Sequence, residues 1–206
     1  EWGISIIDRM HNTNIARKSC LSVMRKNWLN KATSSILYVS LVANKIDLVN
    51  FNRCNSCNDI LYNIEYTKDA FVLSWAIPLT LQEKNDLLLY QFSFFPLIED
   101  IIYTSYKVDF SLYNGMYKAY GRKTDRYNLG AIRKETSLSL PVSSFIYEDK
   151  FIIRTILPFD QLNFKHIPHK NDLCVSAEIY KKHYGTIYHK LNKNNSNTHM
   201  FLIAIK

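Results

Sequence analysis

The sequence predicts an α+β fold in which a long N-terminal helix packs on an antiparallel β-sheet. Apolar residues recur at three-to-four spacing through residues 3–32, which is the periodicity of an amphipathic helix. From residue 71 onward, runs of β-branched and aromatic residues alternate with short polar turns, as in a chain of strands. The 206 residues are 47% hydrophobic and 21% charged, so the chain has enough apolar material for a core.

The helix is expected over residues 1–33, with polar and charged residues on its other faces. His11 to Asn14 form helices poorly, so this segment is a place where the helix kinks or breaks. The apolar positions that define its buried face are Ile6, Ile7, Met10, Cys20, Val23, Met24 and Trp28.

The segment after the helix predicts a strand followed by a polar loop. Residues 36–42 are rich in β-branched and aromatic side chains, which favours a strand. Residues 44–47 are typical of a turn, and residues 48–51 are expected to pair back on the strand. We expect residues 52–59, which contain two cysteines, to form a polar loop.

The rest of the chain predicts two β-rich halves, residues 34–121 and 136–206, within a single domain spanning residues 1–206. Pro78 and Asp86 in the first half have counterparts in Pro141 and Asp149, at the same separation along the chain. This pattern indicates either a duplicated β-unit or two runs of ordinary strand-turn-strand sequence. Two charged stretches, residues 122–134 and 190–198, are typical of linkers, and the apolar residues 200–205 are expected to close a sheet edge. A short helix is expected after each proline that follows a strand, at residues 96–102 and 158–164.

No motif for catalysis or cofactor binding is present in the sequence, so we expect no enzymatic activity, no cofactor and no metal in this chain. It contains no GxGxxG, GxxxxGK[ST], GxSxG or HExxH pattern. The apolar stretch 87–103 includes Gln91, Pro96, Glu99 and Asp100, which argues against a membrane span. The formal net charge of +8 is compatible with nucleic-acid binding, but the basic residues are scattered, which favours a solvated surface instead.

The four cysteines, Cys20, Cys54, Cys57 and Cys174, are the candidate site residues, with a redox or disulfide role. Four cysteines allow two disulfides in three connectivities. We favour Cys20 with Cys54, because a thiol on the helix meets a thiol just past the next strand if the helix packs on that strand. The loop between them would have about 34 residues, and closing it would stabilise the fold by roughly 3–4 kcal/mol. A static staple, a redox switch and buried thiols all remain open as roles.

Three other groups of residues are candidate binding sites. Cys54 and Cys57 form a CxxC, but thioredoxin-type chemistry needs that motif at the start of a helix. His166 and His169, with Cys174, are the remaining residues with spacing suited to zinc, and a polar loop explains the histidines equally well. The tyrosines either line a ligand pocket or pack across strands, and they include Tyr103, Tyr106, Tyr113, Tyr117 and Tyr120.

The run from Cys20 to Ser56 resembles the CSS-motif domain, a periplasmic sensor found N-terminal to EAL-type cyclic-di-GMP phosphodiesterases. Cys20, Arg25, the pair Tyr38-Val39 and Cys54 occur in the order of that family, although Asn55 replaces the middle serine of its Cys-Ser-Ser triplet. The resemblance implies a PAS-like fold in the periplasm of a bacterium. It also implies that a Cys20–Cys54 disulfide restrains a phosphodiesterase domain that is not part of this chain.

From this resemblance we expect a redox- or ligand-sensing domain that sends its signal to membrane helices in the inner membrane and to a cytoplasmic output domain. A periplasmic thiol-disulfide oxidoreductase and a second copy of the chain are further expected partners, and nucleic acid is not. Two alternatives come from other classes of protein. One is a basic β-rich nucleic-acid-binding protein of viral or mobile-element origin, and the other is an exported adhesin or binding module.

Overall fold

The computed structural model describes residues 36–54, 57–81, 88–96, 103–128, 132–169, 172–183, 187–190 and 201–206. This part of the chain is nearly all β-structure, with short 3₁₀ helices as its helical elements. The predicted α+β, PAS-like fold is therefore wrong: the strands form one curved, nearly closed sheet instead of a sheet covered by helices. The helix predicted over residues 1–33 lies outside the described residues.

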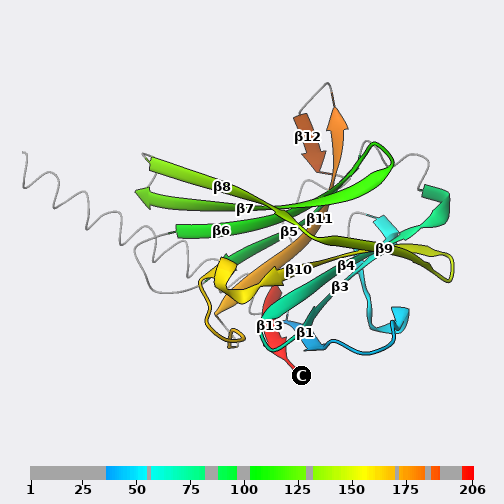
Figure 1. Ribbon diagram of the computed structural model, residues 1–206, viewed down its shortest axis with the longest axis horizontal. Coiled ribbons are helices and arrows are strands. Elements are labelled where there is room, and N and C mark those ends of the chain that lie inside the picture. Colours follow the sequence, from blue (N-terminus) through cyan, green and yellow to red (C-terminus); the bar gives the residue numbers. More distant parts are fainter. Residues whose placement is uncertain are drawn as a thin grey trace, which may run out of the picture.

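Thirteen strands make up the sheet, and eleven of them follow one another side by side (Figure 1). The other two, β12 (Ile187–Lys190) and β2 (Asn52–Cys54), pair with β11 and β3. In spatial order the eleven are β8 (Ile132–Leu140), β7 (Met116–Asn128), β6 (Tyr103–Tyr113), β5 (Leu88–Pro96), β11 (Leu173–His183), β13 (Phe201–Ile205), β1 (Ile36–Leu41), β3 (Cys57–Tyr66), β4 (Ala70–Pro78), β10 (Lys150–Pro158) and β9 (Val142–Tyr147).

Pro141 joins the two ends of this sheet. The end strands β8 and β9 are consecutive in the chain and Pro141 alone separates them. Proline has no N–H for the ladder, so the pairing with β7 stops there and the chain continues as the partner of β10. The hydroxyl of Thr155 on β10 donates to the carbonyl of Pro141 at 2.6 Å. One bent stretch of chain thus belongs to both ends of the sheet, which brings the sheet close to a closed barrel (Figure 1).

The strand β1 connects the two halves of the sheet on the opposite side. Its first residues pair in parallel with β13, and Ser40 and Leu41 pair in parallel with β3. The strand predicted over residues 36–42 is confirmed, and the apolar segment near the C-terminus is a strand as well. That segment, β13, lies between β11 and β1 in the middle of the sheet, so the expectation that it closes an edge was wrong.

Aromatic side chains from opposite walls of the sheet form the core. The ring of Trp75 on β4 lies 4.9 Å from that of Phe92 on β5, and Phe71 stacks on Phe94 at 5.8 Å. All four side chains are fully buried. Burying one such ring stabilises a fold by about 1.5–3 kcal/mol, so these contacts hold the two walls together.

The strand β4 is buried on both faces because a second layer covers its outer side. Residues 42–51 cross that side, and we call them the strap. The strap contains the 3₁₀ helix η1 (Leu48–Asn50), which Asp47 caps by accepting from the amide of Val49. Phe51 at the end of the strap packs with Ala76 and Ile152. Residues 48–51 were expected to pair back as a strand, and this expectation was wrong.

Three further expectations fall on these strands. The linker expected over residues 122–134 is wrong, because residues 122–128 belong to β7 and residues 132–134 belong to β8. The predicted duplication is not present in the topology: β9 and β10 form a hairpin, whereas β4 and β5 lie in different parts of the sheet. The short helix expected near residues 158–164 is confirmed as η3 (Phe159–Leu162), and the one expected near residues 96–102 lies mainly outside the described residues.

Candidate functional site

Cys54 and Cys57 are directly opposite each other at the end of the hairpin formed by β2 and β3. The polar loop predicted over residues 52–59 is therefore wrong, since residues 52–54 form β2 and residues 57–59 begin β3. Directly opposed residues in an antiparallel pair have Cα atoms about 4.5–5.5 Å apart and project their side chains from the same face. That separation falls within the range of about 4.4–6.8 Å that a disulfide spans.

Two buried tyrosines come close to this pair of thiols, namely Tyr62 on β3 and Tyr90 on β5, and the buried Tyr117 on β7 lies beside Tyr90, with their ring centroids 6.4 Å apart. Burial is the main cause that raises the pKa of Tyr62, and the charge of Cys54 adds to it. The pKa of Tyr90 is also raised, first by burial, then by Tyr117, and further by Cys57 and Cys54. We call these five residues the cysteine–tyrosine cluster.

The cluster supports thiol chemistry better than hydrolytic or metal chemistry. Tyr62 and Tyr90 stay protonated well above neutral pH because burial disfavours the phenolate. Protonated hydroxyls can donate hydrogen bonds to a thiolate but cannot serve as general bases at neutral pH. Two thiols on one face of a hairpin can form a bond with each other, which is the reaction that this arrangement makes available.

Cys174 lies in a different part of the molecule. It is a fully buried thiol on β11, between Phe95 of β5 and Leu202 of β13. Two strands, β13 and β1, separate its strand from that of Cys57. Burial raises the pKa of Cys174 to about 11, so this thiol is protonated and unreactive at neutral pH.

The other predicted site residues are spread over the structure. Cys20 lies outside the described residues, so its bond with Cys54 stays a prediction. His166 and His169 are exposed in the loop after η3, and the described residues contain no group of three or more ligands able to hold a metal ion. Among the tyrosines, Tyr106 and Tyr117 are buried in the core, whereas Tyr113 and Tyr120 are exposed.

A network of polar residues also lies across β5 to β8, and the sequence reasoning missed it. The carboxylate of Asp109 on β6 accepts from Gln91 on β5 at 2.5 Å and from the Nε of Arg122 on β7 at 2.7 Å. A second Arg122 nitrogen lies 2.5 Å from the same carboxylate, and a third lies 3.9 Å from Glu135 on β8. Asp109 and Gln91 are buried, yet each stands between two core residues in sequence, where alternation points it to the other face of the sheet.

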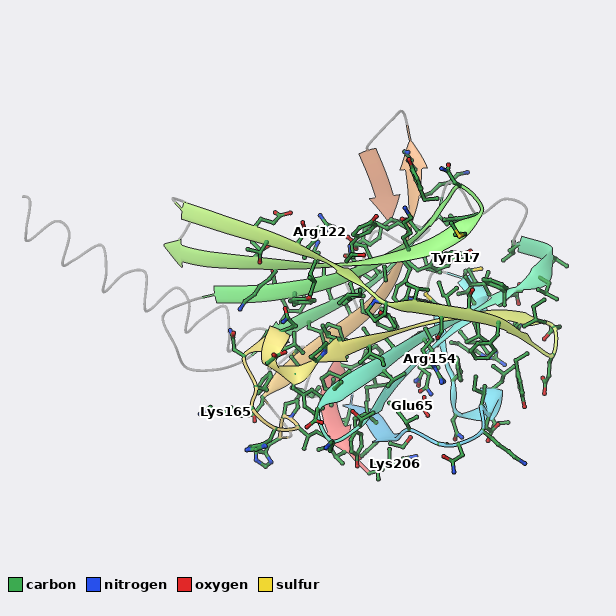
Figure 2. All side chains as sticks on the ribbon, in the orientation of Figure 1. Glu65, Tyr117, Arg122, Arg154, Lys165 and Lys206 are labelled. Carbon is green, nitrogen blue, oxygen red and sulfur yellow. The ribbon has the colours of Figure 1, made fainter. Side chains whose placement is uncertain are left out.

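A smaller ion pair lies beside the strap. Arg154 on β10 lies 3.4 Å from the carboxylate of Glu65 on β3, and its Nε donates to Ser74 on β4 at 3.0 Å (Figure 2). The amide of Ala43, in the strap, donates to Glu65 at 3.5 Å. Since Glu65 is buried, these partners compensate a charge that would otherwise be costly to bury.

We compared the chain with protein-family models, curated proteins and solved structures, and none of them matches. Among the described residues, no helix has the length and apolar character needed to cross a membrane. The fold and the cysteine pair therefore define the class to which the protein belongs. In its described residues it is a barrel-like, nearly all-β domain with two cysteines opposite each other at the end of a hairpin.

Proposed function

We propose that this chain is a redox-sensing domain in which Cys54 and Cys57 alternate between two thiols and a disulfide. The observation that supports this function is the direct opposition of the two cysteines across the hairpin. Opposed positions of an antiparallel pair have Cα separations that fall within the range a disulfide spans. The role is signal input and not catalysis, because the cluster offers thiols and protonated tyrosines alone.

The strap is the element through which the redox state would act on the rest of the domain. The strap ends at Phe51, and β2 follows at once and ends at Cys54. The pairing of β2 with β3 is irregular between Arg53 and Cys54, so the cysteine end of the hairpin is set apart from the regular ladder. A disulfide would hold this end fixed, and reduction would release it together with the strap that covers β4.

The wider setting is a proposal that rests on the resemblance to the CSS-motif domain. It places the chain in the periplasm, attached to membrane helices and to a cyclic-di-GMP phosphodiesterase that the disulfide regulates. In that version Cys20, and not Cys57, is the partner of Cys54. The full-length gene tests the setting: flanking membrane helices and a cytoplasmic EAL domain would support it, and their absence would refute it.

Peptide mapping of the oxidised protein tests the proposed function. Trypsin places Cys20 in residues 19–25, Cys54 and Cys57 together in residues 54–68, and Cys174 in residues 171–181. The protein is oxidised, the remaining thiols are alkylated, and the digest is analysed by mass. A peptide 54–68 that is two hydrogens lighter and carries no alkyl group is the expected result.

The other results of this experiment are equally distinct. Peptide 19–25 joined to peptide 54–68 would replace the proposed pair with a bond between Cys20 and one of the two hairpin cysteines, and fragmentation of the joined peptide would show whether that cysteine is Cys54. Complete alkylation of all cysteines after oxidation would refute the redox function. The Cys174→Ser variant is the matched control, because its peptide 54–68 should behave as in the unchanged protein.

A further inference from the structure

The two opposed thiols differ in their access to solvent. Cys54 ends β2 with 1% of its surface exposed and contributes to the core cluster. Cys57 begins β3, is partly exposed, and packs against the same cluster from its border. The Cys57 thiol is thus accessible to another molecule in solution, whereas the core shields Cys54 from solvent.

From this difference we infer that Cys57 is the thiol that exchanges with disulfides outside the domain, and that Cys54 then completes the reaction from inside. The substrate class is an external disulfide, either a small one such as glutathione disulfide or one carried by a protein. This inference deepens the proposed redox function and rests on it. It assigns Cys57 as a site of reversible mixed-disulfide formation. Because Cys54 is buried, an external disulfide reacts with Cys57 in preference to Cys54.

The reaction has two exchange steps. The Cys57 thiolate, having released its proton to solvent, attacks one sulfur of the external disulfide, forms a mixed disulfide and expels the other half as a thiolate. The Cys54 thiol then attacks the Cys57 sulfur, forms the Cys54–Cys57 bond and expels the second half, which takes up the proton that Cys54 gives up. The two cysteines lose two electrons together, and the external disulfide gains them as it becomes two thiols.

The geometry excludes the reverse order. Attack on an external disulfide requires that disulfide to approach the sulfur along the axis of its own S–S bond. At Cys54 the approach is blocked by the core, where Tyr62 and Ile60 of the neighbouring strand are also buried. Cys174 is excluded as well, since it is fully buried.

Glutathione disulfide provides the test, used on the full chain with Cys54→Ser and Cys57→Ser as a matched pair of variants. The readout is glutathione on peptide 54–68, measured by mass over time, so that modification of Cys20 or Cys174 does not interfere. Cys54→Ser should accumulate a stable adduct on this peptide because the completing thiol is missing. Cys57→Ser should form the adduct at least ten-fold more slowly.

Both variants are also tested in urea, where equal rates would show that the difference in the folded protein comes from burial. Equal rates in the folded variants, or a faster reaction of Cys57→Ser, would overturn the inference, and so would the absence of any adduct in Cys54→Ser. Failure of the proposed function gives a different result. In that case Cys54→Ser still forms its adduct, but the unchanged protein keeps glutathione on Cys57 and forms no internal bond.

Discussion

Replacing Asp109 with asparagine should destabilise the fold markedly, although the substitution hardly changes the size of the side chain. The carboxylate accepts from both Arg122 and Gln91, and asparagine would retain one acceptor oxygen and turn an NH₂ group toward the other donor. A hydrogen bond to a charged group contributes about 1.5–3 kcal/mol, and breaking a fully buried ion pair costs about 3–5 kcal/mol. The Arg122 side chain is 38% exposed and regains hydration, so we expect the free energy of unfolding to fall by about 2–3 kcal/mol.

Urea unfolding followed by tryptophan fluorescence measures this loss, with Glu135→Gln as the control. Glu135 is 39% exposed and lies 3.9 Å from Arg122, so its change should stay below about 0.5 kcal/mol. A cycle with Arg122→Met should then give a coupling of about 2 kcal/mol with Asp109→Asn. If Asp109→Asn unfolds at the same urea concentration as the unchanged protein, the network does not stabilise the fold and this reasoning is wrong.

Three other substitutions test the core, the strap and the buried thiol. Gly121→Ala would place a Cβ atom 2.1 Å from the Tyr106 hydroxyl and should lower the free energy of unfolding by about 1–3 kcal/mol. Tyr106→Phe alone should leave the stability nearly unchanged, because this hydroxyl has no hydrogen-bond partner among the described residues. Chemical denaturation of both variants measures the two effects. Arg154→Met should cost about 2–4 kcal/mol because Glu65 stays buried without its cation, and adding Glu65→Gln should recover part of that loss in a double-mutant cycle. Burial raises the pKa of Cys174 from 9.0 to about 11, so the folded state keeps the thiol proton longer than the unfolded state does. The stabilisation that comes from keeping this thiol protonated is complete below pH 9 and is lost as the pH rises toward 11, by at most about 1.4 kcal/mol per pH unit. Unfolding curves of Cys174→Ala should not show this loss of stability between pH 9 and 10.

Local patterns predicted the individual strands far better than their arrangement. The β-branched run 36–42 became β1, and the Pro-initiated turn near residue 158 became η3. The charged stretch 122–134 has the composition of a linker, because strands near the end of a sheet carry charges as linkers do. Pairing between distant strands, such as β1 with β13, has no local signal in one sequence.

The buried charges show the same limit at the level of single residues. Asp109 lies between Val108 and Phe110, and that alternation predicts a strand with one polar face. It does not predict that the polar face is buried, since burial of Asp109 depends on Gln91 and Arg122 from neighbouring strands. The network was therefore visible only after the register of β5, β6 and β7 was known.

The two cysteines illustrate why register decides function in this chain. A CxxC has one meaning at the start of a helix, where the helix dipole stabilises a thiolate, and another at the end of a hairpin, where two strands hold the sulfurs opposite each other. The spacing is the same in both cases. Here the pairing of Asn52 and Arg53 with Tyr62 and Leu61 precedes the cysteine pair and directs the chain back on itself. The difference in reactivity between the two thiols then follows from burial, and for this reason access to Cys57 is the property on which the proposed exchange depends.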